Sequence, residues 1–313
     1  RRRHGWQIRP EWVLHTTGVI PALSAVIKAL TQPGDKVLIQ TPVYNHFFTS
    51  IHNSGCQAAE SPLVYRDNTY TIDFDDLERK AADPAVKLML LCNPHNPAGR
   101  VWTPAELHRI GELCLRHDVV VVADEIHCEL VMPGFRYTPF ASLCEEFERR
   151  SVTCTSPSKA FNLAGLQVAN IFAADAALRA RIGHSLQINE TGEIGPFAIE
   201  ALIAAYDEGA EWLDALNEYL HGNYRFSREY FDRNLPQYPV LPLEGTYLVW
   251  VDCRASGLTS DELETKLLEE AKLRINPGAI YGEAGRDFIR LNIACPRKLL
   301  AEGLDRLRKV LKR

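Results

Sequence analysis

The sequence predicts an α/β fold, in which helices lie on both sides of a mostly parallel sheet as a three-layer sandwich, with a smaller α+β domain at the C-terminal end. Short apolar runs alternate with helical patterns from Thr16 to about Ala174, and this alternation is typical of βαβ units. The chain has 313 residues, about twice the usual length of one domain. Hydrophobic residues make up 46% of it and charged residues 24%, as in ordinary globular proteins.

The first part of the chain carries clear helix and strand patterns. Apolar residues at helical spacing, each run followed by Pro or Gly, predict three helices: Pro21–Leu30, Tyr44–Asn53 and Asp73–Ala82. Short apolar runs predict four strands: Val37–Gln40, Leu88–Cys92, Val119–Ala123 and Ser151–Thr155. The second and third of these strands are apolar throughout, so we expect helices to cover both of their faces. Between them, Thr103-Pro104-Ala105-Glu106 predicts a capped helix start.

The pattern changes in the last third of the chain. Long helical stretches cover Ala198–Tyr206 and Glu211–Asn234, and Leu235-Pro236 ends the second of them. Beyond it we expect a smaller unit of strands and helices: Thr246–Asp252, Ser260–Lys272, Phe288–Ile293 and Arg297–Arg313. The predicted domains are therefore a large domain of residues 1–213 and a small domain of residues 214–313, with the boundary along the long helix.

Charge and hydropathy exclude two kinds of partner. The formal net charge is −5, so no basic surplus is available to neutralise a nucleic-acid backbone, and we interpret Arg1-Arg2-Arg3 as a solvated chain end. The longest apolar runs have the length of strands, far below the roughly 20 residues that a membrane-spanning helix needs.

The cysteines and the start of the chain carry two further expectations. The 8 cysteines form no C-x-x-C pair, which favours reduced thiols and a cytoplasmic location. The chain starts without methionine, and His4-Gly5-Trp6 is typical of the middle of a domain, so we expect a further N-terminal segment.

Several short motifs match one part of a known two-part signature, but the sequence lacks the other part. The apolar strand that ends in Asp124-Glu125 is similar to the acidic strand of P-loop ATPases, yet the sequence has no Gly-Lys dipeptide. Ser156-Pro157-Ser158-Lys159 matches the S-x-x-K of penicillin-recognising acylases without S-D-N or K-T-G. His127-Cys128-Glu129 matches the H-x-E of zinc deaminases without P-C-x-x-C. No G-x-G is present, which excludes the dinucleotide fingerprint.

Polar residues remain at the predicted strand ends, where α/β folds bind ligands. Lys159 follows the strand Ser151–Thr155, Asp124 ends a valine-rich strand, and Asn96 lies in a proline-rich loop. Thr17-Gly18-Val19-Ile20 precedes a helix, whose free N–H groups and dipole suit a phosphate.

Each of these features has an ordinary alternative. A lysine in a loop is usually solvated, Asp124 could cap a helix, and the loops could be plain turns. The functional interpretation of Asp124 is a partner for a cationic ring nitrogen, as pyridoxal phosphate requires. The carboxylate would keep that nitrogen protonated, so that the ring accepts the electrons released at the substrate α-carbon.

Motifs along the whole chain carry a resemblance: TTGVIPALS (Thr16–Ser24), TPVYNHF (Thr41–Phe47), LLCNPHNPAGRVWT (Leu90–Thr103), ADEIH (Ala123–His127), SPSKAFNLAGL (Ser156–Leu166) and FIRLNIACPR (Phe288–Arg297). In this order and spacing, the chain resembles the fold-type I pyridoxal-phosphate enzymes of the class I/II aminotransferase superfamily. Within that superfamily it is most similar to the MalY/PatB-type cystathionine β-lyases.

The resemblance implies a role for each matching residue. Lys159 would hold pyridoxal 5'-phosphate covalently through its amine, and Asp124 would pair with the ring nitrogen. Tyr44, otherwise a core aromatic residue, would lie against the face of the ring. The further cofactor contacts that the resemblance implies come from Asn96, His127, Gly18, Val19, Ile20, Ser156 and Ser158.

The resemblance also implies how the substrate is held. Arg290 would bind the α-carboxylate of an amino acid with the two-pronged geometry that lysine lacks, although a surface arginine on a strand is the alternative. Gln167 departs from the pattern, because aspartate aminotransferases carry a phosphate-binding arginine there. Members of the superfamily complete the site with an N-terminal aromatic residue that reaches the neighbouring subunit, so a homodimer with shared active sites is implied.

The implied activity is cleavage of a carbon–sulfur bond. L-Cystathionine or an L-cysteine conjugate would be converted to a thiol, pyruvate and ammonia. The amine of Lys159 would remove the α-proton, which requires its pKa to lie below the ordinary ~10.4. An aminotransferase, which shares the first steps, is one alternative. A non-catalytic cofactor-binding sensor domain of a transcription regulator is another.

Overall fold

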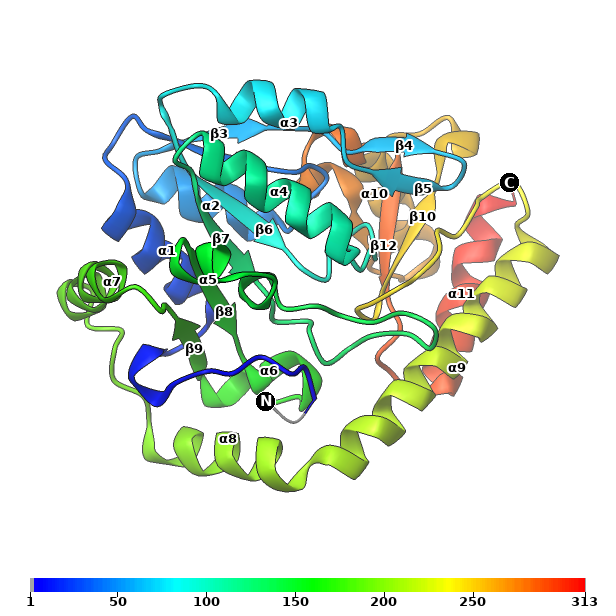
Figure 1. Ribbon diagram of the computed structural model, residues 1–313. Coiled ribbons are helices and arrows are strands. Elements are labelled where there is room, and N and C mark those ends of the chain that lie inside the picture. The colour runs from blue at the N-terminus through cyan, green and yellow to red at the C-terminus, as the bar shows by residue number, and fades with distance from the viewer. Residues whose placement is uncertain (1–2, 313) are drawn as a thin grey trace.

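A seven-stranded sheet lies at the centre of the molecule, and the computed structural model describes residues 3–312 (Figure 1). Its strands follow the order β1-β9-β8-β7-β6-β2-β3. Strands β3, β2, β6, β7 and β8 are parallel, whereas β9 is antiparallel to both of its neighbours. The bounds are β1 Val13–Thr16, β2 Lys36–Ile39, β3 Gln57–Glu60, β6 Val86–Cys92, β7 Val120–Asp124, β8 Ser151–Thr155 and β9 Ala169–Phe172. The mostly parallel sheet that the sequence predicts is confirmed.

Helices cover both faces of this sheet, which confirms the predicted three layers (Figure 1). Leu88 and Leu90 of β6 belong to the core formed with α1, α2 and α7, whereas Met89 and Leu91 belong to the core formed with α3 and α4. The bounds of the helices are α1 Val19–Leu30, α2 Asn45–Asn53, α3 Phe74–Ala81, α4 Pro104–Arg116, α5 Glu145–Arg149, α6 Pro157–Ala160 and α7 Ala176–Ile188.

Local signals set where the helices begin. The Thr103 hydroxyl accepts the Glu106 N–H, and the Glu106 carboxylate accepts the Thr103 N–H, so the predicted capping box is confirmed. Helix α1 begins at Val19, two residues before the predicted start at Pro21. Proline is tolerated there because the first turn of a helix has no intrahelical partner for its N–H groups.

A second, three-stranded antiparallel sheet of order β10-β12-β11 forms the smaller unit. Helices α8 and α9 lead to it, and α10 and α11 pack with it (Figure 1). The bounds are α8 Pro196–Glu208, α9 Ala210–Asn234, β10 Leu248–Asp252, α10 Ser260–Ala271, β11 Asn276–Pro277, β12 Phe288–Asn292 and α11 Arg297–Leu311, and a hairpin is formed by β4 Val64–Arg66 and β5 Thr69–Thr71. The predicted domain boundary after residue 213 falls inside α9 and stays a prediction.

Four predicted element ends shift in the smaller unit, and those of α10 and β12 shift by only one residue, to Ala271 and Asn292. Strand β10 begins at Leu248 rather than Thr246, because Thr246 has a left-handed backbone with φ 71°, which a strand does not accommodate. Helix α11 ends at Leu311, and Arg313 lies outside the described residues. Within residues 3–312, no helix is both long enough and apolar enough to cross a bilayer.

Candidate active site

A cavity of about 450 Å³ is lined by residues that follow the parallel strands of the large sheet and by residues of the small sheet. Because the carboxyl ends of parallel strands meet at one edge, side chains far apart in sequence come together there. Apart from Ser156, all the predicted site residues line this cavity: Gly18, Val19, Ile20, Tyr44, Asn96, Asp124, His127, Ser158, Lys159 and Arg290.

Asp124 is the last residue of β7 and is buried. Its Oδ1 accepts a hydrogen bond from the N–H of Ile126 at 3.2 Å. Burial raises the pKa of this carboxyl from 3.8 to about 7, while the Ile126 N–H and the charge of Lys159 oppose the shift. The protein thus offers few contacts that offset the cost of burying this negative charge, so a cationic partner in the cavity would stabilise the carboxylate.

Lys159 lies in the short helix α6 and is partly buried. Burial lowers the pKa of its amine below the ordinary 10.5, the nearby Arg290 lowers it further, and Asp124 opposes the shift. The lowered pKa increases the fraction of neutral amine at a given pH. Neutral amine is the form that attacks an aldehyde and accepts a proton, so the environment of Lys159 suits both roles.

The N-terminus of α1 borders the same cavity. Gly18 is the N-cap residue, and no side chain caps the helix there. The N–H groups of Val19 and Ile20 therefore lie in a first turn without intrahelical partners, at the positive end of a 12-residue helix. With the side chain of Ser158 at the same cavity, these groups form a place for a phosphate.

Ser156 has a structural role in this geometry. Its hydroxyl accepts the N–H of Ser158 at 3.1 Å, which caps α6, and donates to the carbonyl of Val168 at 2.7 Å. Both contacts hold the hydroxyl within the protein, which explains why Ser156 does not line the cavity. Gln167 is exposed and does not line the cavity either.

Arg290 extends from β12 and is held by two amide oxygens. Nη1 donates to Oδ1 of Asn96 and Nη2 to Oδ1 of Asn276, both at 3.0 Å. The Arg290 Cζ lies 4.9 Å from the ring centroid of Tyr281. Nε is buried and has no partner among the described residues. Burial lowers the pKa of Arg290, yet guanidinium stays charged in proteins, so an anion in the cavity would be stabilised here.

Tyr44 and His127 line the cavity as neutral rings. Burial, and then the charge of Asp124, raise the pKa of Tyr44 to about 12. Burial, and then Lys159 and Arg290, lower the pKa of His127 to about 3, so its imidazole is neutral near pH 7. The Nδ1 of His127 is buried and has no partner among the described residues, which leaves it free to bond with a group in the cavity.

Several residues that line the cavity from the small-sheet side were not predicted, among them the polar residues Tyr247, Asn276 and Tyr281. Asn276 lies opposite Arg290 in the pairing of β11 with β12, and β11 has only two residues, too few for a strand pattern. The alternation Thr246-Tyr247-Leu248 and the turn residues after Asn276 were the available signals. We call Asn96, Asp124, His127, Ser158 and Lys159 the large-sheet wall, and Tyr247, Asn276, Tyr281 and Arg290 the small-sheet wall.

These features fit pyridoxal 5'-phosphate. The ring nitrogen would meet the buried Asp124 carboxylate, and the aldehyde would meet the Lys159 amine. The phosphate would meet the free N–H groups of α1. Asn96 uses its Oδ1 for Arg290, so its amide N–H is left to donate to the phenolic oxygen of the ring. The unpartnered Nδ1 of His127 supports the same interpretation.

Comparisons with known proteins agree with this geometry. The family described as aminotransferase class I and II matches residues 1–307. Cystathionine β-lyase PatB of Bacillus subtilis is 43% identical over 311 residues, which are 99% of this chain and 80% of that protein. Protein MalY of Escherichia coli is 34% identical over an alignment of 309 residues, and the match covers 96% of this chain and 77% of that protein. The crystal structure of cystalysin from Treponema denticola, which contains pyridoxal 5'-phosphate, matches with a TM-score of 0.97 and 38% identity over 99% of this chain and 79% of that chain.

Proposed function

The chain belongs to the class I and II aminotransferase family, and from this premise we propose which of its residues carry its reaction. It is a pyridoxal-phosphate-dependent carbon–sulfur β-lyase, related to the cystathionine β-lyase PatB. Its substrates are L-cystathionine or L-cysteine conjugates, and its products are a thiol, pyruvate and ammonia. The observation that carries the assignment of residues is that Lys159, Asp124 and Arg290 line one cavity.

The large-sheet wall holds the cofactor. When bound, pyridoxal phosphate supplies a sink for the electron pair left at the substrate α-carbon. The Lys159 amine would bind the aldehyde carbon covalently, and the Asp124 carboxylate would keep the ring nitrogen protonated. Asn96 and His127 would donate to the phenolic oxygen, and Tyr44, which also lines the cavity, would place its ring against the cofactor.

The small-sheet wall holds the substrate. The guanidinium of Arg290 binds the α-carboxylate, since Asn96 and Asn276 fix its orientation. With the cofactor and the substrate bound, the Lys159 amine would be the base that removes the α-proton, and its lowered pKa leaves the amine able to accept that proton. The Cβ–S bond then breaks, and sulfur leaves with the bonding electron pair as a thiolate.

One assay separates the lyase from an aminotransferase. The purified holoenzyme is given L-cystathionine, and pyruvate release is measured with and without an added keto acid. The lyase forms pyruvate and thiol in equal amounts without the keto acid. Turnover that depends on the keto acid, with no thiol released, would assign the protein as a transaminase instead. Cofactor binding without turnover of any amino acid would favour the sensor domain.

We also propose that the protein is a homodimer with shared active sites, and exposed apolar residues of α7 and α8 support this. Phe197 of α8 is 81% exposed and Ile188, at the end of α7, is 69% exposed. Ile199 and Ile203 of α8 are exposed as well, and α8 lies at the edge of the molecule (Figure 1). Several large apolar side chains exposed on neighbouring helices are more typical of a protein interface than of a free surface.

The assembly is tested by sedimentation of the holoenzyme. The wild-type chain is expected to sediment as a dimer, and Phe197→Asp to shift it towards monomer at micromolar concentration. Phe135→Asp is the control, because Phe135 is an exposed phenylalanine on another part of the surface. A monomeric wild-type protein with full lyase activity would exclude the shared site.

The thiols of this protein support a cytoplasmic location, which we propose on that ground. All the cysteines are free, and most are buried. Burial raises the pKa of several of them, for example Cys92 and Cys114. Such thiols are poorly reactive, as expected of a protein that folds without disulfides.

A further inference from the structure

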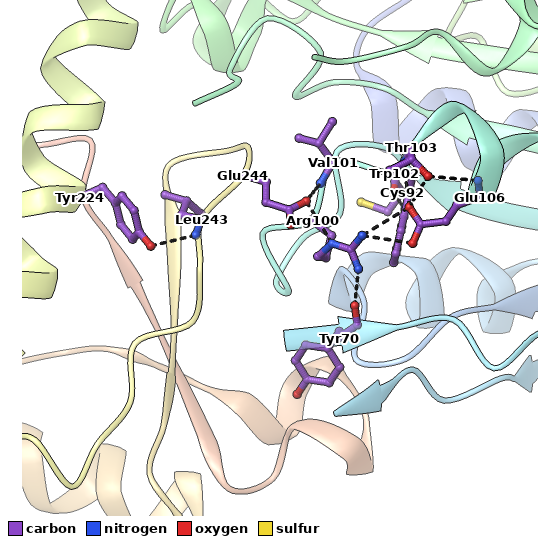
Figure 2. Close-up of polar contacts among 10 residues, drawn as sticks. All are labelled: Tyr70, Cys92, Arg100, Val101, Trp102, Thr103, Glu106, Tyr224, Leu243 and Glu244. Atoms are coloured by element: carbon purple, nitrogen blue, oxygen red, sulfur yellow. Dashed lines mark hydrogen bonds and ion pairs between the residues drawn. The ribbon is translucent and has the colours of Figure 1, made fainter. Parts of the chain in front are cut away.

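One guanidinium outside the cavity joins three segments of the chain. Figure 2 shows Arg100 between the hairpin strand β5, the start of α4 and the segment that precedes β10. Its Nε donates to Oε2 of Glu244 at 3.0 Å, its Nη2 to Oε1 of Glu106 at 3.1 Å, and its Nη1 to the carbonyl of Tyr70. Each nitrogen of the Arg100 guanidinium therefore donates to a different segment of the chain.

This cluster is shielded from solvent. The side chains of Arg100 and Glu244 are only 11% and 13% exposed. Glu244 Oε2 also accepts the N–H of Val101 at 2.8 Å, and the backbone N–H of Glu244 donates to the carbonyl of Gly99 at 2.8 Å. An ion pair with so little solvent, supported by hydrogen bonds on both sides, has a well-defined geometry.

The backbones of the two joined segments are in direct contact. Gly99 has a positive φ of 72°, and a Cβ there would lie 2.9 Å from Cδ1 of Leu243. A Cβ on Gly245 would lie 2.8 Å from Cγ2 of Val101. Glycine suits both positions, because a larger residue would require the neighbouring side chain of Leu243 or Val101 to move. The Arg100–Glu244 pair thus lies beside a tightly packed contact between the two segments.

Each segment leads to a residue of the cavity. On one side, the carbonyl of Arg100 accepts the N–H of His95 at 2.8 Å, and the next residue is Asn96, which holds Nη1 of Arg290. On the other side, Glu244 is followed closely by Tyr247 and then by β10, whose Trp250 pairs with Arg290 in the small sheet. The pair therefore connects both ends of the Asn96–Arg290 contact.

We propose that Arg100 and Glu244 are positioning residues: by fixing the Asn96 loop against the segment that leads to β10, they set the orientation of the Arg290 guanidinium towards the substrate carboxylate. Neither of them lines the cavity. The proposal rests on the proposed function, because it takes Arg290 as the carboxylate-binding group. It predicts an effect on substrate binding that is specific for the carboxylate.

The test compares two ligands that differ in one group. S-Methyl-L-cysteine carries the α-carboxylate, and 2-(methylthio)ethylamine lacks it. In Glu244→Gln, the KM for S-methyl-L-cysteine should rise about tenfold with kcat changed less than about twofold, the pattern of a loss in ground-state binding. The inhibition constant of the amine should stay unchanged, because it does not contact Arg290. The cofactor absorbance should also be unchanged, since Lys159 and Asp124 remain.

Two further variants complete the test. Arg100→Lys keeps the charge, but an ammonium cannot reproduce the planar fork, so it should change the KM in the same direction and serves if Glu244→Gln does not fold. Glu145→Gln removes an exposed ion pair with Arg149 and should change nothing. A KM like that of the wild type in both folded variants, or equal weakening of both ligands, would overturn the proposal. A wild-type enzyme without lyase turnover would instead overturn the proposed function.

Discussion

The two walls of the cavity carry charge in different ways. In the large-sheet wall, the Lys159 amine and the Asp124 carboxylate have opposite charges, and each favours the ionised form of the other. In the small-sheet wall, the contacts of the Arg290 guanidinium among the described residues are amide oxygens and a tyrosine ring, and none of them is a carboxylate.

This difference indicates what each wall binds. Burial shifts the pKa values of both the Lys159 amine and the Asp124 carboxyl group. Such a pair is suited to a cofactor that stays bound, reacts with the amine and places a positive charge beside the carboxylate. A cation held only by neutral acceptors is suited to an anion that binds and leaves at every turnover, because no carboxylate of the protein competes for it. The predictions below alter one wall at a time.

The largest effect is expected at the amine of the large-sheet wall. Lys159→Ala should lower the rate of pyruvate release by roughly 10⁴-fold or more, because general-base catalysis alone typically contributes ~10²–10⁴-fold and the covalent attachment is lost as well. The absorbance of the covalently attached cofactor should disappear. Both are measured on the purified protein, by a pyruvate assay and an absorption spectrum.

The control for this variant is Lys312→Ala, since Lys312 is exposed near the chain end. It should change neither the spectrum nor the rate. Full activity in Lys159→Ala would show that another amine carries the reaction and that the large-sheet wall is wrongly assigned.

The next effect is expected at the carboxylate of the same wall. Asp124→Asn keeps the shape and removes the charge, so the ring nitrogen is no longer held protonated. The kcat should fall by roughly 10²–10³-fold, the range seen when one preorganised electrostatic partner is removed, while the cofactor stays covalently bound. Steady-state kinetics and the spectrum are measured together. Asp118→Asn, at an exposed aspartate paired with Arg150, is the matched control.

A smaller effect with a different pattern is expected from the small-sheet wall. Arg290→Lys keeps the positive charge but loses the two-pronged geometry. The KM should rise about 10- to 100-fold, because a hydrogen bond to a charged group contributes about 1.5–3 kcal/mol. The spectrum of the bound cofactor should not change. This result would separate the walls, since Asp124→Asn acts mainly on kcat.

Arg286→Lys is the control for this change, because Arg286 is exposed and pairs with Glu283 on the surface. If Arg290→Lys altered the cofactor spectrum as strongly as Asp124→Asn, the two walls would not act separately, and the comparison would fail.

The sequence predicted the two walls unequally well, for a physical reason. Asp124 ends a valine-rich strand and Lys159 lies shortly after the strand Ser151–Thr155. A polar residue at such a strand end is visible in the sequence, because the carboxyl ends of parallel strands meet at one edge of the sheet. Asn276 and Tyr281 come next to Arg290 through an antiparallel register and a two-residue strand. Pairing between distant segments leaves no local pattern, so these residues were missed.

Ser156 is the opposite case, a motif residue whose observed contacts are local. The motif predicts a phosphate ligand, but a serine directly before a proline at the first helical position is also an N-cap signature. In the structure Ser156 caps α6, and Ser158 lines the cavity in its place. The local capping signal was present in the sequence and describes this residue better than the motif did.

The smallest predicted effect concerns the stability of the protein without its cofactor. The folded protein keeps the Asp124 proton up to a pKa of about 7, whereas the unfolded chain releases it near 3.8. Between these values the folded state binds more protons than the unfolded state, so the free energy of unfolding falls as the pH rises. One such proton contributes a slope of roughly 1 kcal/mol per pH unit.

Urea unfolding between pH 4.5 and about 6.5 measures how the free energy of unfolding depends on pH. In Asp124→Asn this dependence should be weaker, because the variant lacks the one proton that Asp124 retains in the folded state. Glu125, whose pKa burial also raises to about 7, contributes a slope of the same sign in both proteins, and because the charge of Asp124 is the smallest of the causes of that shift, most of this contribution cancels in the difference. With cofactor bound, the protonated ring nitrogen makes the ionised carboxylate the favoured form, so the wild-type slope should approach that of the variant. Equal slopes for the two cofactor-free proteins would mean that Asp124 is already ionised in the empty cavity. The large-sheet wall would then hold a permanent charge, as the small-sheet wall does, and the difference between the walls would lie in geometry alone.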